Sequence, residues 1–171
     1  MTEQTEFTGN TSEKVIWQLI SWSINDPFFE EYINKETGLL TQRGEEQLAL
    51  GIKLLMLASW KMSDAHGFHD SGRPFSEAIA LIHSEVSEAL EAWRSNDAQL
   101  WYMDEQTFSP VPQNETRDGK PRKAEGMSAE FADVLIRIGD VSEEEMFNLI
   151  WALITKMRYN NTRPHMHGKR A

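Results

Sequence analysis

The sequence predicts an all-α protein that folds as one helical bundle. At 171 residues the chain has about the length of a single domain, and 40% of it is apolar, which is enough to form a core. Apolar residues recur at helical spacing in several segments, whereas none alternates in the way a half-buried strand does. We find no internal repeat of about 20 to 50 residues, so a solenoid is not expected.

The first part of the chain is expected to contain little regular structure. Residues 1–11 are polar and predict a flexible N-terminus, after which residues 12–160 form the single domain. Ser12 can cap a first helix, because serine oxygens accept hydrogen bonds from free amide groups at helix starts. A short helix is expected over residues 28–33.

The middle of the chain predicts two longer helices and two loops. Apolar residues every three or four positions predict a helix over 45–62, and glycines and a proline predict a loop over 66–74. The next helix is expected to be capped by Ser76 and to end near Arg94. Residues 104–126 contain three prolines and no sustained periodicity, which predicts a surface loop or lid.

Two further helices are expected near the C-terminus. Ser128 is placed to cap a helix that ends near Gly139, and Ser142 is placed to cap a final helix that ends near Asn160. Residues 161–171 are then expected to form a basic tail.

Composition excludes several classes of protein. The absence of cysteine excludes disulfide scaffolds, thiolate nucleophiles and zinc ribbons, and is typical of a reducing compartment, so we expect a cytoplasmic protein. No apolar run approaches the roughly 20 residues that cross a bilayer. The net charge of -10 argues against broad binding to nucleic acid or anionic membranes.

Acidic and basic residues are segregated along the chain. Residues 151–171 carry a charge of +5 and contain no acid, whereas the preceding 150 residues carry -15. The basic end is therefore suited to anionic ligands.

Two pairs of acids flank apolar stripes on the predicted helices. Glu85 and Glu88 are three positions apart, so their carboxylates point to the same side of one helix. Glu130 and Asp133 repeat this arrangement on another. The stripes consist of Ile79, Ile82, Val86, Ala89 and Trp93 on the first helix and Phe131, Val134, Leu135 and Ile138 on the second.

If these helices pack antiparallel through their stripes, the four carboxylates converge at the edge of the core. Their like charges then favour a bound divalent cation, and oxygen ligands suit Mg²⁺ or Mn²⁺. A single E-x-x-E pair is more often the solvated rim of an amphipathic helix, but the matched second pair favours a metal site.

The two acidic motifs, Glu85-x-x-Glu88 and Glu130-x-x-Asp133, stand in an order that resembles the MazG-like branch of the all-α nucleoside triphosphate pyrophosphatases. Residues 156–164 and His167-Gly168-Lys169 add to this resemblance, which covers roughly residues 60–171.

The resemblance implies hydrolysis of a nucleoside triphosphate to the monophosphate and pyrophosphate, within the dNTP pool. The four acids of the two motifs would hold magnesium, or manganese in its place, and the ion would activate a water. The family can bind two or more ions at this site. Phosphate oxygens would be bound by Lys156, Asn160, Arg163 and Lys169. The resemblance also implies a homo-dimer or homo-tetramer.

Two aspects of this site are less defined. Many relatives have an acid where this chain has Ser84, which leaves the number of metals and the base that activates water open. Aromatic and polar residues before the first motif are candidates for binding the base, with a lean to guanine because a carboxylate can accept its paired donors. These candidates are Trp60, Phe68, His69 and Asp70.

Three alternatives remain open. A pyrophosphohydrolase specific for dUTP or dCTP, or one acting on phosphoribosyl-ATP, would share the metal site. A non-enzymatic helical oligomerisation module would need no metal at all. A ferritin-like oxidase is disfavoured because no glutamate has a histidine three residues later.

Overall fold

The computed structural model describes residues 16, 19 and 26–164. The expected N-terminus over 1–11 lies outside these residues, as does almost all of the helix expected after Ser12. The chain divides into two compact units, one formed by Met1–Ala49 with Trp151–Ala171 and the other by Leu50–Ile150. Each unit is described by itself.

The first unit contains the short helix near the N-terminus and the last helix of the chain. A 3-10 helix, η1 (Pro27–Glu31), begins at Asp26, whose carboxylate accepts a hydrogen bond from the amide of Phe28 at 3.0 Å. The first turns of α2 (Gln42–Ala65) and most of α5 (Leu149–Asn161) complete this unit. Arg158 on α5 donates to Glu45 on α2 at 2.7 Å, and this ion pair ties the two segments together.

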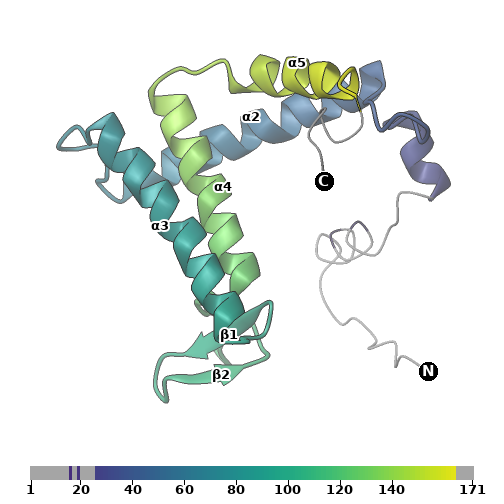
Figure 1. The fold of residues 1–171 in the computed structure, drawn as a ribbon. Coiled ribbons are helices and arrows are strands. Elements are labelled where there is room, and N and C mark those ends of the chain that lie inside the picture. The colour runs from purple at the N-terminus through teal and green to yellow at the C-terminus, as the bar shows by residue number, and fades with distance from the viewer. Residues whose placement is uncertain (1–15, 17–18, 20–25, 165–171) are drawn as a thin grey trace, which may run out of the picture. The chain divides into compact units, whose positions relative to one another are not determined.

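The second unit is built on a helical hairpin. Helices α3 (Phe75–Arg94) and α4 (Met127–Glu144) run antiparallel and pack side by side (Figure 1). The rest of α2 belongs to the same unit, and Lys53 on α2 donates to Glu143 on α4 at 2.5 Å. No helix in the described part of the chain is long and apolar enough to cross a membrane.

A small sheet connects the two helices of the hairpin, within the segment where the sequence predicts a surface loop or lid over 104–126. Strands β1 (Trp101–Asp104), β2 (Ser109–Val111) and β3 (Ala124–Glu125) form an antiparallel sheet in the order β2-β1-β3. Tyr102 pairs with Val111 on one side and with Ala124 on the other. The molecule is thus mostly helical, with a minor β component that the all-α prediction lacks.

The expected serine caps are wrong, although the helices they were to begin are present. Helix α3 begins after Pro74 and α4 after Gly126, and within the described chain neither has a side-chain cap. Gly126 has a φ of 97°, and a Cβ there would stand 2.4 Å from the carbonyl oxygen of Ala98. Close passage of the backbone, rather than a serine oxygen, therefore fixes where α4 begins.

Helix α4 continues past Gly139, where the sequence predicts its end. Gly139 lies against α2, where an added Cβ would be 3.0 Å from the Ser59 hydroxyl oxygen. This glycine allows two helices to approach instead of ending one of them. Ser142, expected to cap the last helix, is consequently a buried residue inside α4.

The hairpin buries only part of the two predicted apolar stripes. Ala89 is buried between the helices, whereas Val86 is 46% exposed and Trp93 is 65% exposed. On α4, Phe131 and Leu135 are also more than half exposed. Two helices share a narrow seam, so the outer part of each broad stripe faces away from the partner helix.

Candidate metal centre

Three of the four motif carboxylates converge between α3 and α4. Glu85, Glu88 and Glu130 each offer an oxygen within 4.8 Å of the others. The i, i+3 spacing puts the first two on one face of α3, and antiparallel packing brings the first turn of α4 opposite them. Glu85 is buried, Glu130 is half-buried and Glu88 is exposed, so the cluster lies at the boundary of core and solvent.

Polar neighbours hold two of these carboxylates in place. Arg137, on α4, contacts the Oε1 oxygen of Glu85 through both Nε and Nη2, each at 2.6 Å. Ser84 donates its hydroxyl to Oε1 of Glu88 at 3.0 Å. The Ser84 hydroxyl therefore fixes the orientation of a motif carboxylate.

The cluster carries an excess of negative charge. Burial raises the pKa of Glu130, and the charges of Glu88 and Glu85 raise it further. Asp133 is exposed as a residue, but partial burial of its carboxyl group raises its pKa, and the charge of Glu85 adds to this. Asp133 thus lies within electrostatic reach of the cluster, although it is not one of the three acids whose oxygens converge.

The donor set fits a hard divalent cation. Several carboxylate oxygens, with no sulfur or imidazole among them, are the ligands that Mg²⁺ and Mn²⁺ prefer. Burial and repulsion from neighbouring acids raise the pKa of Glu130 and of Asp133, and a bound cation would offset both effects. Glu85, Glu88 and Glu130 are the residues that could hold it, with Asp133 beside them.

The sheet adds charged groups beside this cluster. Lys123 donates to Glu125 at 2.5 Å, which raises the pKa of Lys123, and the charges of Glu130 and Asp133 raise it further. Glu125 in turn contributes to the raised pKa of Glu130. The segment expected to be a lid therefore places both a cation and a fifth acid near the candidate site.

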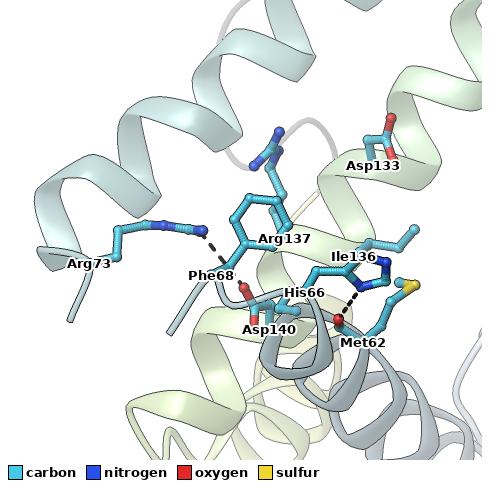
Figure 2. Close-up of a pocket in the computed structure, with 9 residues that line it drawn as sticks. Met62, His66, Phe68, Arg73, Asp133, Ile136, Arg137 and Asp140 are labelled. Atoms are coloured by element: carbon cyan, nitrogen blue, oxygen red, sulfur yellow. Dashed lines mark hydrogen bonds and ion pairs between the residues drawn. The ribbon is translucent and has the colours of Figure 1, made fainter. Parts of the chain in front are cut away.

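A cavity of about 320 Å³ adjoins the cluster (Figure 2). Two residues beside the carboxylates, Asp133 and Arg137, line it, and Figure 2 shows α4 supplying one wall. Its volume is within the range of small-molecule sites. The complete lining is Met62, Ser63, His66, Phe68, Arg73, Asp133, Ile136, Arg137 and Asp140.

One of the four candidates for base binding lines this cavity. Phe68 exposes 56% of its surface, and the Arg73 guanidinium lies 5.4 Å from the centre of its ring. Trp60 instead stacks on His69 at 5.5 Å, and His69 contacts the carboxylate of Asp140 at 3.0 Å. Asp70 is exposed and is not part of the cavity wall.

The candidates for phosphate binding belong to the other compact unit. Lys156 and Asn160 are exposed on α5, and Arg163 follows the end of that helix. Lys169 lies outside the described residues. The assignment of these four residues to phosphates stays a prediction from the sequence.

Three charged residues of the site were not predicted from the sequence. Arg137 and Asp140 follow Asp133 by four and seven positions on α4, so helical spacing already places them on the same face. That signal was available, because a basic residue one turn after an acidic motif can reach the same group. Arg73, in the loop before α3, carries no such signal, since its place on the cavity wall depends on tertiary packing.

Comparison with known proteins adds no relative. No protein family model, curated protein or solved structure matches this chain. The functional argument therefore rests on the residues and geometry of the site.

Proposed function

We propose that the protein is a metal-dependent nucleoside triphosphate pyrophosphohydrolase, which cleaves a ribo- or deoxyribonucleoside triphosphate to the monophosphate and pyrophosphate. One observation carries the proposal: three carboxylates from two helices place oxygens within 4.8 Å of one another beside a cavity of about 320 Å³. The sequence resemblance to MazG-like enzymes supplies the reaction.

Glu85, Glu88 and Glu130 hold Mg²⁺ or Mn²⁺ in this proposal, and Asp133 contributes charge at the rim. The ion would neutralise the triphosphate and lower the pKa of a coordinated water. Ser84 keeps Glu88 in a fixed orientation, which lowers the cost of assembling the site. The cavity, with Phe68 and Arg73 on its wall, receives the base and sugar.

The decisive experiment is a panel of nucleoside triphosphates incubated with Mg²⁺ or Mn²⁺, with monophosphate and pyrophosphate separated from diphosphate and phosphate. We expect monophosphate and pyrophosphate as products. Glu88→Gln and Glu130→Gln should each abolish turnover while the helical circular dichroism signal is retained. Glu91→Gln is the matched control, because Glu91 lies on the same helix, is 70% exposed and pairs with Arg94.

The same panel separates the alternatives. A dUTP- or dCTP-specific enzyme would act on one base, and a phosphoribosyl-ATP pyrophosphohydrolase would turn over that compound alone. The lean to guanine rests on a carboxylate in the base site; Asp140 lines the cavity and Asp70 does not, so the panel should include dGTP against dATP. An oligomerisation module would bind no Mn²⁺ and release no pyrophosphate.

We propose a homo-oligomer as the working form, either a dimer or a tetramer. The support is the apolar outer face of the helical hairpin, defined by Val86, Leu90, Trp93, Phe131 and Leu135, each at least 46% exposed. Burial of large side chains such as these on a second copy is favourable by about 1.5–3 kcal/mol each when complete.

A further inference from the structure

Arg137 is the basic residue that contacts both the carboxylate cluster and the cavity. Its Nε and Nη2 atoms lie 2.6 Å from Oε1 of Glu85, and its side chain also lines the cavity wall. Figure 2 shows it with Asp133 and Asp140 on the α4 side of that space. Arg73 lines the same cavity, and it forms an ion pair with Asp140, at 3.9 Å, rather than with a member of the cluster.

The contact between Arg137 and Glu85 involves only part of the guanidinium and only one oxygen of the carboxylate. Both nitrogens of Arg137 contact one oxygen of Glu85, and the other oxygen has no hydrogen-bond partner among the described residues. The Glu85 side chain is 9% exposed, whereas that of Arg137 is 34% exposed. The carboxylate is therefore enclosed, while the guanidinium retains access to the open space beside it.

A cation bound at the cluster would replace Arg137 as the positive charge that compensates the Glu85 carboxylate. In the ion-free protein, Arg137 is the positive charge in contact with this buried acid, and a buried acid without such a partner is costly. A divalent ion on the same carboxylate supplies that charge and repels the guanidinium. Arginine is also the side chain best shaped to bind a phosphate with two parallel hydrogen bonds.

We infer that Arg137 is an ion-dependent phosphate ligand: it pairs with Glu85 while the metal site is empty, and turns into the adjacent cavity to bind a nucleotide phosphate when a divalent ion occupies Glu85. This inference rests on the proposed function, since it needs both the ion and the nucleotide. It also predicts an order of binding. The ion binds first, and only then does Arg137 contact the phosphate.

The wild-type chain can be tested first, by NMR of the arginine Nε–H group. The resonance of Arg137, assigned by its loss in Arg137→Lys, should show slow solvent exchange without metal because a carboxylate accepts its proton. Addition of Mg²⁺ should shift it and speed its exchange, and a nucleoside monophosphate added afterwards should slow the exchange again. A resonance that Mg²⁺ leaves unchanged would show that Arg137 stays on Glu85, and would overturn the inference.

Variants test the same inference through two affinities, for Mn²⁺ and for nucleotide, that should change in opposite directions. In Arg137→Gln, Mn²⁺ measured by electron paramagnetic resonance should bind roughly tenfold more tightly, because no charge-assisted pair must be broken. Nucleoside monophosphate in the presence of Ca²⁺ should bind roughly tenfold more weakly, since one charged phosphate contact is lost. Arg73→Gln is the matched control and should leave Mn²⁺ affinity within about twofold, because Arg73 contacts no member of the cluster.

The outcomes separate this inference from the proposed function. If wild-type protein binds Mn²⁺ and Arg137→Gln binds it equally well or more weakly, Arg137 does not compete with the ion and the inference is wrong. If Mn²⁺ binds more tightly but nucleotide affinity is unchanged, the phosphate role is wrong. If the wild-type chain binds no Mn²⁺, the proposed metal site itself fails, and the inference fails with it.

Discussion

Glu130 shows how a single carboxylate connects the stability of this protein to its proposed ligand. It stands in the first turn of α4, and burial and four neighbouring acids raise its pKa. The ionised form is therefore disfavoured in the folded chain relative to the unfolded chain. Its negative charge is nevertheless what a divalent ion requires.

Substitution Glu130→Gln should consequently have opposite effects with and without metal. Without metal, we expect the Tm to rise, because a neutral amide avoids the burial cost and repulsion that raise the pKa of Glu130; each 1 kcal/mol gained raises the Tm of a chain of this size by roughly 2–4 °C. With Mg²⁺ or Mn²⁺, the variant should lose the Tm increase that the wild-type protein shows. Differential scanning calorimetry measures both effects, and Glu91→Gln should reproduce the wild-type curves.

The raised pKa values of Glu130 and Asp133 also predict a dependence on pH. Protonated carboxyl groups are favoured in the folded state, so the stability they contribute is complete below the ordinary pKa of unfolded acids. It is lost as the pH rises through the raised folded pKa. The stabilisation by Mg²⁺ should instead increase as the pH rises, because these groups ionise and can bind the ion.

Thermal unfolding from pH 4 upward, with and without Mg²⁺, checks this sign. A metal-induced Tm shift that is as large at pH 4 as at pH 7.5 would contradict the involvement of these carboxylates. Asp64, Asp104 and Asp118 have lowered pKa values and act in the opposite direction, so the metal-free comparison is made against Glu130→Gln; a stability difference that does not change with pH would contradict the raised pKa of Glu130.

Residue spacing predicted which carboxylates could meet, because helical geometry fixes the direction of i and i+3 side chains. It did not predict that Asp133 would lie beside the other three acids rather than among them. That distinction depends on how α4 is rotated against α3, which the spacing within one helix does not determine. The contacts of Arg137 and Ser84 with these acids could not be predicted either, because they depend on helix packing and on side-chain rotamers.

At the level of elements, the start of α4 is the feature on which the site depends most directly. Glu130 occupies the first turn of this helix, so its position follows from where the helix begins. Gly126 sets that point, because its φ is 97° and the carbonyl oxygens of Ala98 and Gln99 pass close to it.

Gly126→Ala should therefore destabilise the protein by about 2 kcal/mol or more, through backbone strain and a clash with backbone atoms. It should also weaken Mn²⁺ binding, since the first turn of α4 must shift. Gly119→Ala is the matched control: Gly119 has a φ of 77° but no atom within 4 Å of an added Cβ. Chemical denaturation measures both variants, and equal losses would show that the close approach at Gly126 contributes nothing.

The element predictions succeeded where long apolar periodicity was present and also found the short helix η1, but they missed the three short strands. Helix α3 ends at Arg94, as its pattern indicates. The strands contain four, three and two residues, which is too few for alternation to show, and Pro110 in β2 is a residue that normally argues against a strand. Gly139 was mistaken for a helix end because a sequence does not reveal that another helix passes there.

For the whole molecule, the apolar outer face of the helical hairpin has the largest consequence. Leu90 lies on it and is 46% exposed, and Trp93 one turn later is 65% exposed. Exposed residues of this size in one patch are typical of interaction sites. A second copy of the chain would bury the same face on both subunits, as two-fold symmetry requires.

Leu90→Glu should therefore lower the molar mass in solution to 19.7 kDa, the mass of one chain, from a multiple of it. A two-fold interface contains the substituted residue twice, so the penalty of burying its charge is incurred twice. Light scattering coupled to size-exclusion chromatography measures the mass. Leu100→Glu, at a residue that is 48% exposed outside the helices, should leave the assembly intact. A monomeric wild-type chain would remove this basis for an oligomer.

Pro110 affects which surface of the molecule is suited to association. It stands in β2, one of the two edge strands of the sheet, opposite Met103 of β1. Proline has no amide hydrogen, so this margin offers an incomplete row of donors to any strand that approaches it. Growth of the sheet from this edge is thereby discouraged, and association through the helices, as proposed, would avoid the formation of fibres from β2.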